Sequence, residues 1–411
     1  MPKAPNTPLS CIFGLNKPTG QPSMTLLNKL QPLFASSSLF KDKDEQPAPQ
    51  GKKRGGRRGR QERIKMGQGG TLDPLADGVL VIGTNKATKQ LSQFLDCTKS
   101  YRAIALVGCS TDSYDSDGKI VHTTKWDPVT RESVEEKLSL FRGEIEQTPP
   151  VYSALKMDGK PLYEYARSNT PLPRPIPARK VTISDISLLS FTSGSERSDT
   201  YEFPKERLGD DERLEIERLE KMVKEGKTVV PSTEEVVKQE AEQKSVEGTK
   251  DAEQAGTSVN ASEGKPPIFE ISLTVSSGTY IRSVVHDLGI ALGSSAHIVK
   301  LTRTRQGQFA LEPATTTSHS KAATVQNEDA AKVNDDKVET ETAETTPAVA
   351  VEKQLRGCVE WTLLEQAIAR QDKIAKGSQE ARDEADAERQ RDGDGFLDWE
   401  RQILSLCETV S

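Results

Sequence analysis

The stretch GQGGTLDPLADGVLVIG at residues 67–83 carries the most information in this 411-residue chain. Three glycines in four residues allow positive φ angles and let the backbone approach a ligand closely. Asp73 follows three residues after Gly70 and is expected at the mouth of this turn. A purely structural alternative exists, because an aspartate before a proline often starts a helix, with Asp as N-cap and Pro in the first turn.

The charge is unevenly distributed along the chain. The formal net charge is −6, with only 34% hydrophobic and 29% charged residues, which is lean for a single globule. Three segments are acidic, 193–265 (−7), 314–354 (−4) and 371–400 (−5), whereas residues 51–65 carry +7. Without the acidic segments the remainder carries +10. We therefore expect a basic core with solvated acidic appendages.

Several classes of protein and site are not expected. No run of about 18 apolar residues is present, which argues against a transmembrane helix and a membrane partner. The five cysteines form no CxxC pair and the four histidines no cluster, so we expect reduced thiols and no metal site. A phosphate-binding loop at Gly78 and Gly83 fails, because Thr84 stands where that loop requires lysine.

Hydrophobic periodicity predicts an α/β or α+β domain. Alternation predicts strands at 11–17, 79–82, 100–108, 180–191, 268–276 and 297–310. Helical spacing predicts helices at 24–34, with Ser23 as N-cap, and at 87–95, 131–142, 282–292 and 396–408. A further short helix is expected directly after Asp73.

Insertions and tails interrupt these elements. We expect a basic insertion at 35–65 and an acidic, largely disordered insertion at 193–265, whose first part, about 203–225, is predicted as a charged helix. A low-complexity linker is expected at 314–354, followed by a short C-terminal segment at 355–411 with two helical pieces.

The stretch at 67–83, continued by ATKQLSQFL and KSYRA, resembles the TruB-type tRNA pseudouridine synthases that modify uridine-55 in the TΨC loop. Other motifs follow the family's order: KPTG at 17–20, TDSYDSDG at 111–118, PPVYSALKMDGKPLYEYAR at 149–167, SSGTYIRSVVHDLG at 276–289 and AHIVKLTRTRQGQF at 296–309. The similar regions cover about half the chain and look like a eukaryotic, fungal-like, stand-alone member. The resemblance implies the pseudouridine synthase fold, a mixed and mainly antiparallel sheet flanked by helices, with a catalytic core at 1–34, 66–192 and 266–313.

The resemblance also implies an isomerase that needs no cofactor and no metal. Such an enzyme breaks the N-glycosidic bond of a uridine, rotates the base and rejoins it through carbon. Asp73 matches the family's catalytic aspartate, acting either as a nucleophile on the sugar or by promoting a glycal intermediate. Tyr101 matches a tyrosine that stacks on the target base and assists proton transfer; core packing is its structural alternative.

Four further residues are assigned to the site by resemblance. Arg282 is implied as the ion-pair partner of Asp73, and Tyr280 as a substrate contact; we expect these two on one strand and hence on one face. Leu301 matches an apolar residue lining the pocket, although a plain core role is equally compatible. Gln68 stands where bacterial members commonly have histidine, and it can contact a flipped base but cannot titrate.

A third group of residues is expected to support the site. Lys17 and Pro18 belong to the first motif and are expected to brace the catalytic loop. Gly70 belongs to the turn before Asp73. Tyr152 and Lys156 fall in the YSALK motif, for which we expect a role in the fold or the RNA surface.

The resemblance implies tRNA as partner, bound through its TΨC arm, with some mRNA as a further candidate; we expect a monomer. The target uridine must be flipped out of the folded loop to reach Asp73. The basic run is expected to grip the RNA backbone, to serve as a nuclear localisation signal, or both. Its candidate RNA-binding residues are Lys52, Lys53, Arg54, Arg57, Arg58 and Arg60.

Other interpretations remain open from the sequence. The compartment is expected to be the nucleus, the mitochondrion or both, with the cytoplasm as a further alternative. One competing function is the guide-RNA-dependent catalytic subunit of H/ACA particles, which normally carries a C-terminal PUA domain; residues 355–411 show no clear pattern of one. The other is a tRNA-folding factor without turnover.

Overall fold

The computed structural model describes residues 8–41, 64–216, 264–311 and 355–410, apart from residues 154, 169, 171, 175, 211 and 215. Its strands are β1 (Cys11–Lys17), β2 (Met66–Gln68), β3 (Asp77–Thr84), β4 (Lys99–Val107), β5 (Cys109–Thr111), β6 (Ile120–Thr123), β7 (Gly143–Gln147), β8 (Lys156–Met157), β9 (Lys160–Pro161), β10 (Arg179–Thr192), β11 (Ile268–Val275), β12 (Ala296–Gln306), β13 (Phe309–Ala310), β14 (Cys358–Glu360) and β15 (Glu408–Thr409). Its α-helices are α1 (Ser23–Ser36), α2 (Gln93–Asp96), α3 (Arg131–Leu138), α4 (Leu162–Arg167), α7 (Ile281–Ala291), α8 (Trp361–Ala375), α9 (Gln379–Arg391) and α10 (Asp398–Leu406). Short 3₁₀ helices are η1 (Asn85–Gln90), η2 (Ser139–Phe141) and η3 (Gly194–Glu196).

One sheet of eleven strands organises the molecule. Its main path runs β14-β1-β3-β12-β4-β11-β10-β7, with β2, β13 and β15 paired at its margins. Among the strand pairs of the described residues, only β1 with β14 and β12 with β3 are parallel. The predicted mixed and mainly antiparallel sheet with flanking helices is therefore confirmed.

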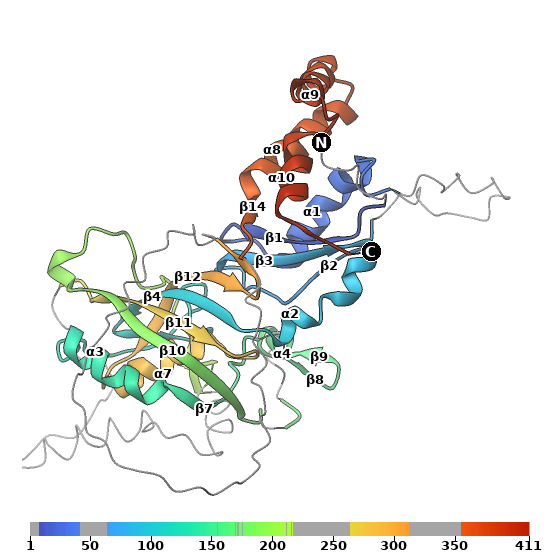
Figure 1. Ribbon diagram of the computed structural model, residues 1–411. Coiled ribbons are helices and arrows are strands. Elements are labelled where there is room, and N and C mark those ends of the chain that lie inside the picture. The colour runs from blue at the N-terminus through green and yellow to red at the C-terminus, as the bar shows by residue number, and fades with distance from the viewer. Residues whose placement is uncertain are drawn as a thin grey trace, which may run out of the picture.

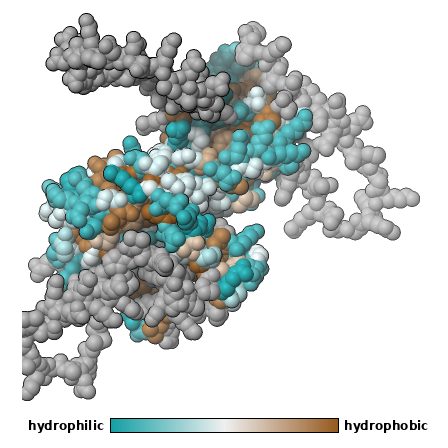
Figure 2. Space-filling view, turned by 60° about the horizontal axis from the view of Figure 1, so that its bottom comes forward, coloured by the Kyte–Doolittle hydropathy of each residue, from teal (hydrophilic) through white to brown (hydrophobic). Residues whose placement is uncertain are grey.

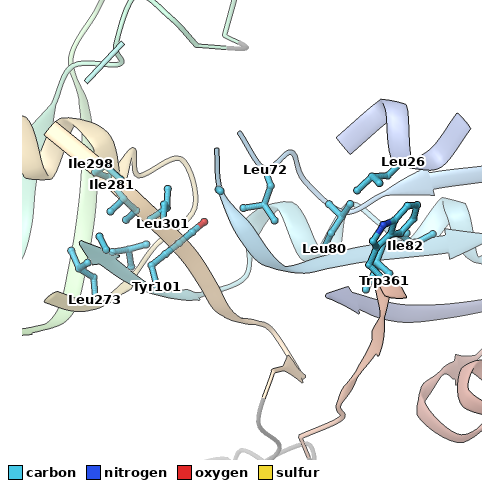
Figure 3. Packing of buried hydrophobic residues seen from close by; sticks show 14 of the residues in the cluster. Leu26, Leu72, Leu80, Ile82, Tyr101, Leu273, Ile281, Ile298, Leu301 and Trp361 are labelled. Carbon is cyan, nitrogen blue, oxygen red and sulfur yellow. The ribbon is translucent and has the colours of Figure 1, made fainter. Parts of the chain in front are cut away.

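Apart from the short helices α2 and α4, the helices lie in two groups at opposite ends of this sheet (Figure 1). α1, α8, α9 and α10 gather near β1 and β14, whereas α3 and α7 lie at the end where β10 and β7 are found. One hydrophobic cluster nevertheless runs through both ends and includes Leu26, Leu80 and Trp361 as well as Tyr101 and Leu273 (Figure 3). The two ends of the sheet therefore share one continuous hydrophobic core.

Strand β4 shows how the sequence pattern forms the sheet. Tyr101, Ala103 and Ala105 are buried on one face, while Arg102 is exposed on the other. This is the predicted alternation, and it places Tyr101 on the face that packs into the main core. β4 pairs with β12 on one side and β11 on the other, so Tyr101 lies on a central strand.

Two helix predictions around the glycine-rich turn are wrong. Residues 71–76 form a loop that leads directly into β3, so Asp73 does not cap a helix. At 87–95 the structure has η1 and then the single turn α2 instead of one continuous helix. Helix α1 begins as predicted, but its N-cap is Pro22, because the Ser23 hydroxyl bonds to Leu72 instead.

The expectation that Tyr280 and Arg282 share one strand is also wrong. β11 ends at Val275, a turn with Gly278 at φ +77° follows, and Tyr280 is the N-cap of α7. Arg282 is therefore the second residue of a helix. The alternating pattern of this short segment resembles a strand, but the positive φ of Gly278 ends the extended backbone before it.

The C-terminal segment is more closely integrated than its predicted pair of helical pieces suggests. It forms α8, α9 and α10, and its strands β14 and β15 both pair with β1. Residues 371–400 are acidic but fold, with Glu388 bonded to Arg370 and Arg401 to three aspartates. Of the predicted charged helix at 203–225, residues 203–209 are not helical and residues 210, 212–214 and 216 are, while the remainder lies outside the described residues.

The visible surface of the described chain is mainly hydrophilic, with smaller hydrophobic areas between the polar residues (Figure 2). No helix in the described part is both long and apolar enough to cross a membrane.

Candidate active site

Asp73 lies in the loop between β2 and β3. The start of this loop is fixed by the Gly69 amide, which donates to the Val81 carbonyl (2.8 Å), and by Gln306 Nε2, which donates to the Gly69 carbonyl (2.5 Å). Gly70 adopts φ +121°, a region that side chains disfavour. The glycines therefore turn the chain sharply enough to present Asp73 next to the sheet.

The first motif holds the other end of this loop. Buried Lys17 Nζ donates to the carbonyls of Pro74 (3.2 Å) and Ala76 (2.5 Å), and to that of Pro18 (2.9 Å). The Gly20 amide also donates to the Pro74 carbonyl (2.7 Å). Lys17 and its neighbours thus contact the loop immediately after Asp73, as the bracing hypothesis requires.

The residue before Asp73 is fixed from the same side. Ser23 Oγ donates to the Leu72 carbonyl (3.0 Å) and accepts from the Leu72 amide (3.2 Å). Both backbone groups of Leu72 are therefore satisfied by one hydroxyl. Together with Lys17, this places hydrogen bonds on both sides of Asp73.

Burial acts on the charge of Lys17. It lowers the lysine's pKa to about 8, and the nearby carboxylates of Asp77 and Asp73 partly offset this effect. Three backbone carbonyls surround Nζ, and only the protonated amine carries three N–H groups to donate to all of them. This geometry fits a loop brace.

Arg282 reaches Asp73 from α7. Its Nε donates to Asp73 Oδ2 (2.9 Å), Nη1 to the Ser113 carbonyl (2.7 Å) and Nη2 to the Tyr152 carbonyl (2.9 Å). Each guanidinium nitrogen therefore has an acceptor, which fixes the plane of the group. The Arg282 side chain is 5% exposed, whereas that of Asp73 is 38% exposed.

A second carboxylate, Asp115, lies 3.6 Å from Arg282 Nη1. Burial raises the pKa of Asp115 to about 6, although Arg282 and a hydrogen bond from Ser113 lower it. For Arg282, burial opposes the charge, but Asp73 and Asp115 outweigh it and raise its pKa. A cation in the first turn is unfavourable in the field of a helix, so these two carboxylates also offset the dipole of α7.

Asp73 keeps one oxygen available. Oδ2 is held by Arg282, while Oδ1 accepts no hydrogen bond within the described part of the chain. A half-exposed carboxylate with one fixed and one available oxygen can attack or assist at an electrophilic carbon.

Tyr101 and Leu301 lie together on neighbouring strands (Figure 3). Both are buried and belong to the main cluster, which also contains Leu72. The Tyr101 hydroxyl points toward the side on which Leu72 lies, and Leu72 is the residue before Asp73. The two proposed pocket residues are thus part of the core, on the side that faces the loop of Asp73 (Figure 3).

Tyr280 is held at the start of α7 and its ring lies against a cation. The Arg179 guanidinium is 5.3 Å from the centroid of the Tyr280 ring. Gln147 Oε1 accepts from the Tyr280 amide (2.7 Å), and Gln147 Nε2 donates to the Tyr280 carbonyl (3.0 Å). Neither Gln147 nor Asp115 was predicted from the sequence as part of the site. The available signal for Gln147 was a polar residue shortly before the Pro149–Pro150 pair, and for Asp115 its place within TDSYDSDG.

The remaining candidates are more scattered. Gln68 Nε2 donates to Thr71 Oγ1 (3.3 Å), within the loop of Asp73. Tyr152 contributes its carbonyl to Arg282, whereas Lys156 is exposed on the β8–β9 hairpin. The six predicted RNA-binding residues of the basic run at 51–60 lie outside the described residues. In the described part of the chain, no group of three or more His, Cys, Asp or Glu is placed to hold a metal ion.

Known proteins are similar to this chain in sequence. A family model described as TruB family pseudouridylate synthase (N terminal domain) matches residues 57–202. The tRNA pseudouridine synthase 4 of Schizosaccharomyces pombe is 39% identical over 328 residues, 73% of this chain and 79% of that protein. The Saccharomyces cerevisiae protein of the same name is 37% identical over 320 residues, 73% and 78% of the two chains. A solved Cbf5-Nop10-Gar1 complex matches with a TM-score of 0.37 at 20% identity, over 74% of this chain and 50% of that one.

The extent of these sequence matches shows the family. The S. pombe relative is aligned over most of its own length. The segment that matches the family model, residues 57–202, contains the glycine-rich turn, Asp73 and Tyr101. The chain belongs to the TruB family of pseudouridylate synthases and is an isomerase.

Proposed function

We propose that this enzyme isomerises uridine to pseudouridine in tRNA, at position 55 of the TΨC loop, with Asp73 as the acting carboxylate. Two relatives aligned over more than three quarters of their length are named tRNA pseudouridine synthases, which supports tRNA as the substrate. The observation that carries the role of Asp73 is its geometry. Arg282 Nε fixes one oxygen at 2.9 Å, and the other remains available on a half-exposed side chain.

In this mechanism the uridine flips out of its loop and its sugar approaches Asp73. Arg282 orients the carboxylate, because its buried guanidinium donates a charge-assisted hydrogen bond to Asp73 Oδ2. Tyr101 and Leu301 would hold the detached uracil while it rotates. Asp73 acts either by attack at C1′ or by promoting a glycal, and both routes use the same available oxygen.

The decisive experiment compares wild type and Asp73→Asn on an unmodified tRNA transcript. Asparagine preserves the shape and can still accept from Arg282, but it lacks the nucleophilic and basic carboxylate. We expect pseudouridine formation to fall by at least about 10³-fold with tRNA affinity largely retained. Unchanged turnover by Asp73→Asn would refute the assignment.

The position and the need for a guide are tested with the same assay. A transcript in which uridine-55 is replaced by cytidine should yield no pseudouridine, whereas replacement of another loop uridine should not matter. Purified protein should act without any guide RNA. Complete inactivity until a guide RNA is added would favour the H/ACA-type alternative.

The basic run is proposed to grip the RNA backbone. Deleting residues 51–60 should weaken binding about equally for different tRNA sequences and flatten the dependence of log K on log salt concentration, because fewer counterions are released. An unchanged salt slope would leave only a role in localisation.

A further inference from the structure

Gln147 makes an unusual double contact with the start of α7. It is the last residue of β7, and its side chain is 2% exposed. Its amide oxygen accepts from the Tyr280 amide (2.7 Å) and its amide nitrogen donates to the Tyr280 carbonyl (3.0 Å). Both polar atoms of one side chain are therefore used on both backbone groups of one residue.

That residue is the N-cap of the helix carrying Arg282. The Tyr280 side chain provides no capping hydrogen bond, so local sequence does not fix where the helix begins. The Tyr280 carbonyl also accepts the Val284 amide (3.2 Å), the first bond of α7. Gln147 therefore holds the position and direction of the first turn from a different strand, two residues before Arg282.

The chain after Gln147 holds the same turn at two more places. The Thr148 carbonyl accepts from Ser283 Oγ (3.4 Å), and the Tyr152 carbonyl accepts from Arg282 Nη2 (2.9 Å). Residues 147–152 thus contact Tyr280, Ser283 and Arg282. Of these three residues in the described segment, Thr148 and Tyr152 contribute backbone carbonyls, whereas Gln147 contributes its side chain. That side chain bonds to the backbone of Tyr280, the N-cap of α7.

We propose that Gln147 is a positioning residue for the isomerisation, acting through Arg282 on Asp73. By fixing Tyr280, it sets where the guanidinium lies relative to the carboxylate. This inference rests on the proposed function, because it assigns Gln147 to the same reaction. An error of about 1 Å in such a pair can cost about 100-fold in rate.

Glutamine suits this role because it offers one donor and one acceptor in a fixed plane. Gln147→Met keeps the length and volume but loses both hydrogen bonds. Gln147→Glu keeps the acceptor when ionised and recovers a donor only when protonated. These two variants separate the hydrogen bonds of Gln147 from its packing.

The test measures single-turnover pseudouridine formation and tRNA affinity for the full-length protein. We expect Gln147→Met to lower the rate roughly 10- to 100-fold, with affinity for tRNA unchanged. The rate of Gln147→Glu relative to wild type should rise as the pH falls, because protonation restores the donor. Ile403→Val is the matched control; it trims a buried side chain on α10, at the other end of the sheet, and should leave the rate unchanged.

A double-mutant cycle tests whether Gln147 acts through Arg282. If it does, Gln147→Met combined with Arg282→Lys should be little slower than Arg282→Lys alone. Fully additive losses would overturn the proposal, and so would a wild-type rate for Gln147→Met in an otherwise active enzyme. A wild-type protein without any turnover would instead refute the proposed function and with it any role of Gln147 in that reaction.

Discussion

The two members of the central ion pair are held in opposite ways. Asp73 lies in an exposed loop, and residues 17–23 hold the backbone on both sides of it, while its own side chain has a single described partner. Arg282 lies in a buried helix, and its side chain meets four acceptor groups from three other segments. Asp73 is thus positioned through its backbone, and its carboxylate keeps one oxygen available. The Arg282 guanidinium is instead immobilised through its own hydrogen bonds.

This difference predicts that the two side chains contribute unequally to folding. Arg282→Met should lower the free energy of unfolding by about 4–5 kcal/mol, because it leaves Asp115 as an unpaired buried carboxylate. It should also reduce turnover by at least about 100-fold. Chemical denaturation and single-turnover kinetics measure the two effects.

Asp73→Asn is the matched comparison on the other side of the pair. It should abolish turnover but change the free energy of unfolding by less than about 1 kcal/mol, because its side chain is partly solvated. Equal destabilisation by Arg282→Met and Asp73→Asn would break the comparison.

On the Asp73 side, stability should depend on the brace. Lys17→Met leaves the buried carbonyl of Ala76 without its donor and removes one of two donors from the carbonyl of Pro74, and we expect a loss of about 2–3 kcal/mol together with slower turnover. Thermal and denaturant unfolding measure the first effect. Lys29→Met, which removes an exposed lysine from α1, is the control and should be nearly neutral. Slow turnover without destabilisation would indicate that Lys17 takes part in the chemistry itself.

On the Arg282 side, stability should depend on pH through Asp115. Its pKa is raised from an ordinary 3.8 to about 6 by burial, despite Arg282 and Ser113, while Asp73 and Asp117 add to the rise. Between these values the folded chain retains a proton that the unfolded chain has lost. The free energy of unfolding should therefore fall as the pH rises from about 4 to about 6, by up to about 3 kcal/mol.

Asp115→Asn should remove this component, because asparagine does not titrate. The free energy of unfolding of wild type and of the variant is measured at pH 4 and at pH 7. The difference between the two proteins should be smaller at pH 4, where Asp115 is protonated and resembles asparagine. An identical pH dependence of both proteins would show that the pKa of Asp115 is the same in the folded and the unfolded chain.

The sequence predicted these two sides with unequal success. The strands were predictable because alternation such as that of residues 101–107 is local, and family motifs pointed to Asp73 and Arg282. The helix predicted at 282–292 agrees with α7 to within one residue, but the placement of Tyr280 and Arg282 on one strand was wrong. The N-cap Tyr280 gives no capping signal, and the turn before it depends on the φ of Gly278. The pairing of the short strands β14 and β15 with β1 was also missed, because short pairings join residues that are 344 positions apart for β14 and almost 400 apart for β15.

The smallest expected effect concerns Ser23, whose hydroxyl satisfies both backbone groups of Leu72. Ser23→Ala should cost about 1–2 kcal/mol, since two buried backbone groups lose one shared partner. Thr19→Ala is the control, because Thr19 bonds the Leu75 carbonyl in the same loop from a more exposed position. If the backbone of the loop positions Asp73, Ser23→Ala should slow turnover more than Thr19→Ala, because Leu72 is directly bonded to Asp73 in the chain. Equal rates for the two variants would mean that Arg282 alone suffices to hold the carboxylate.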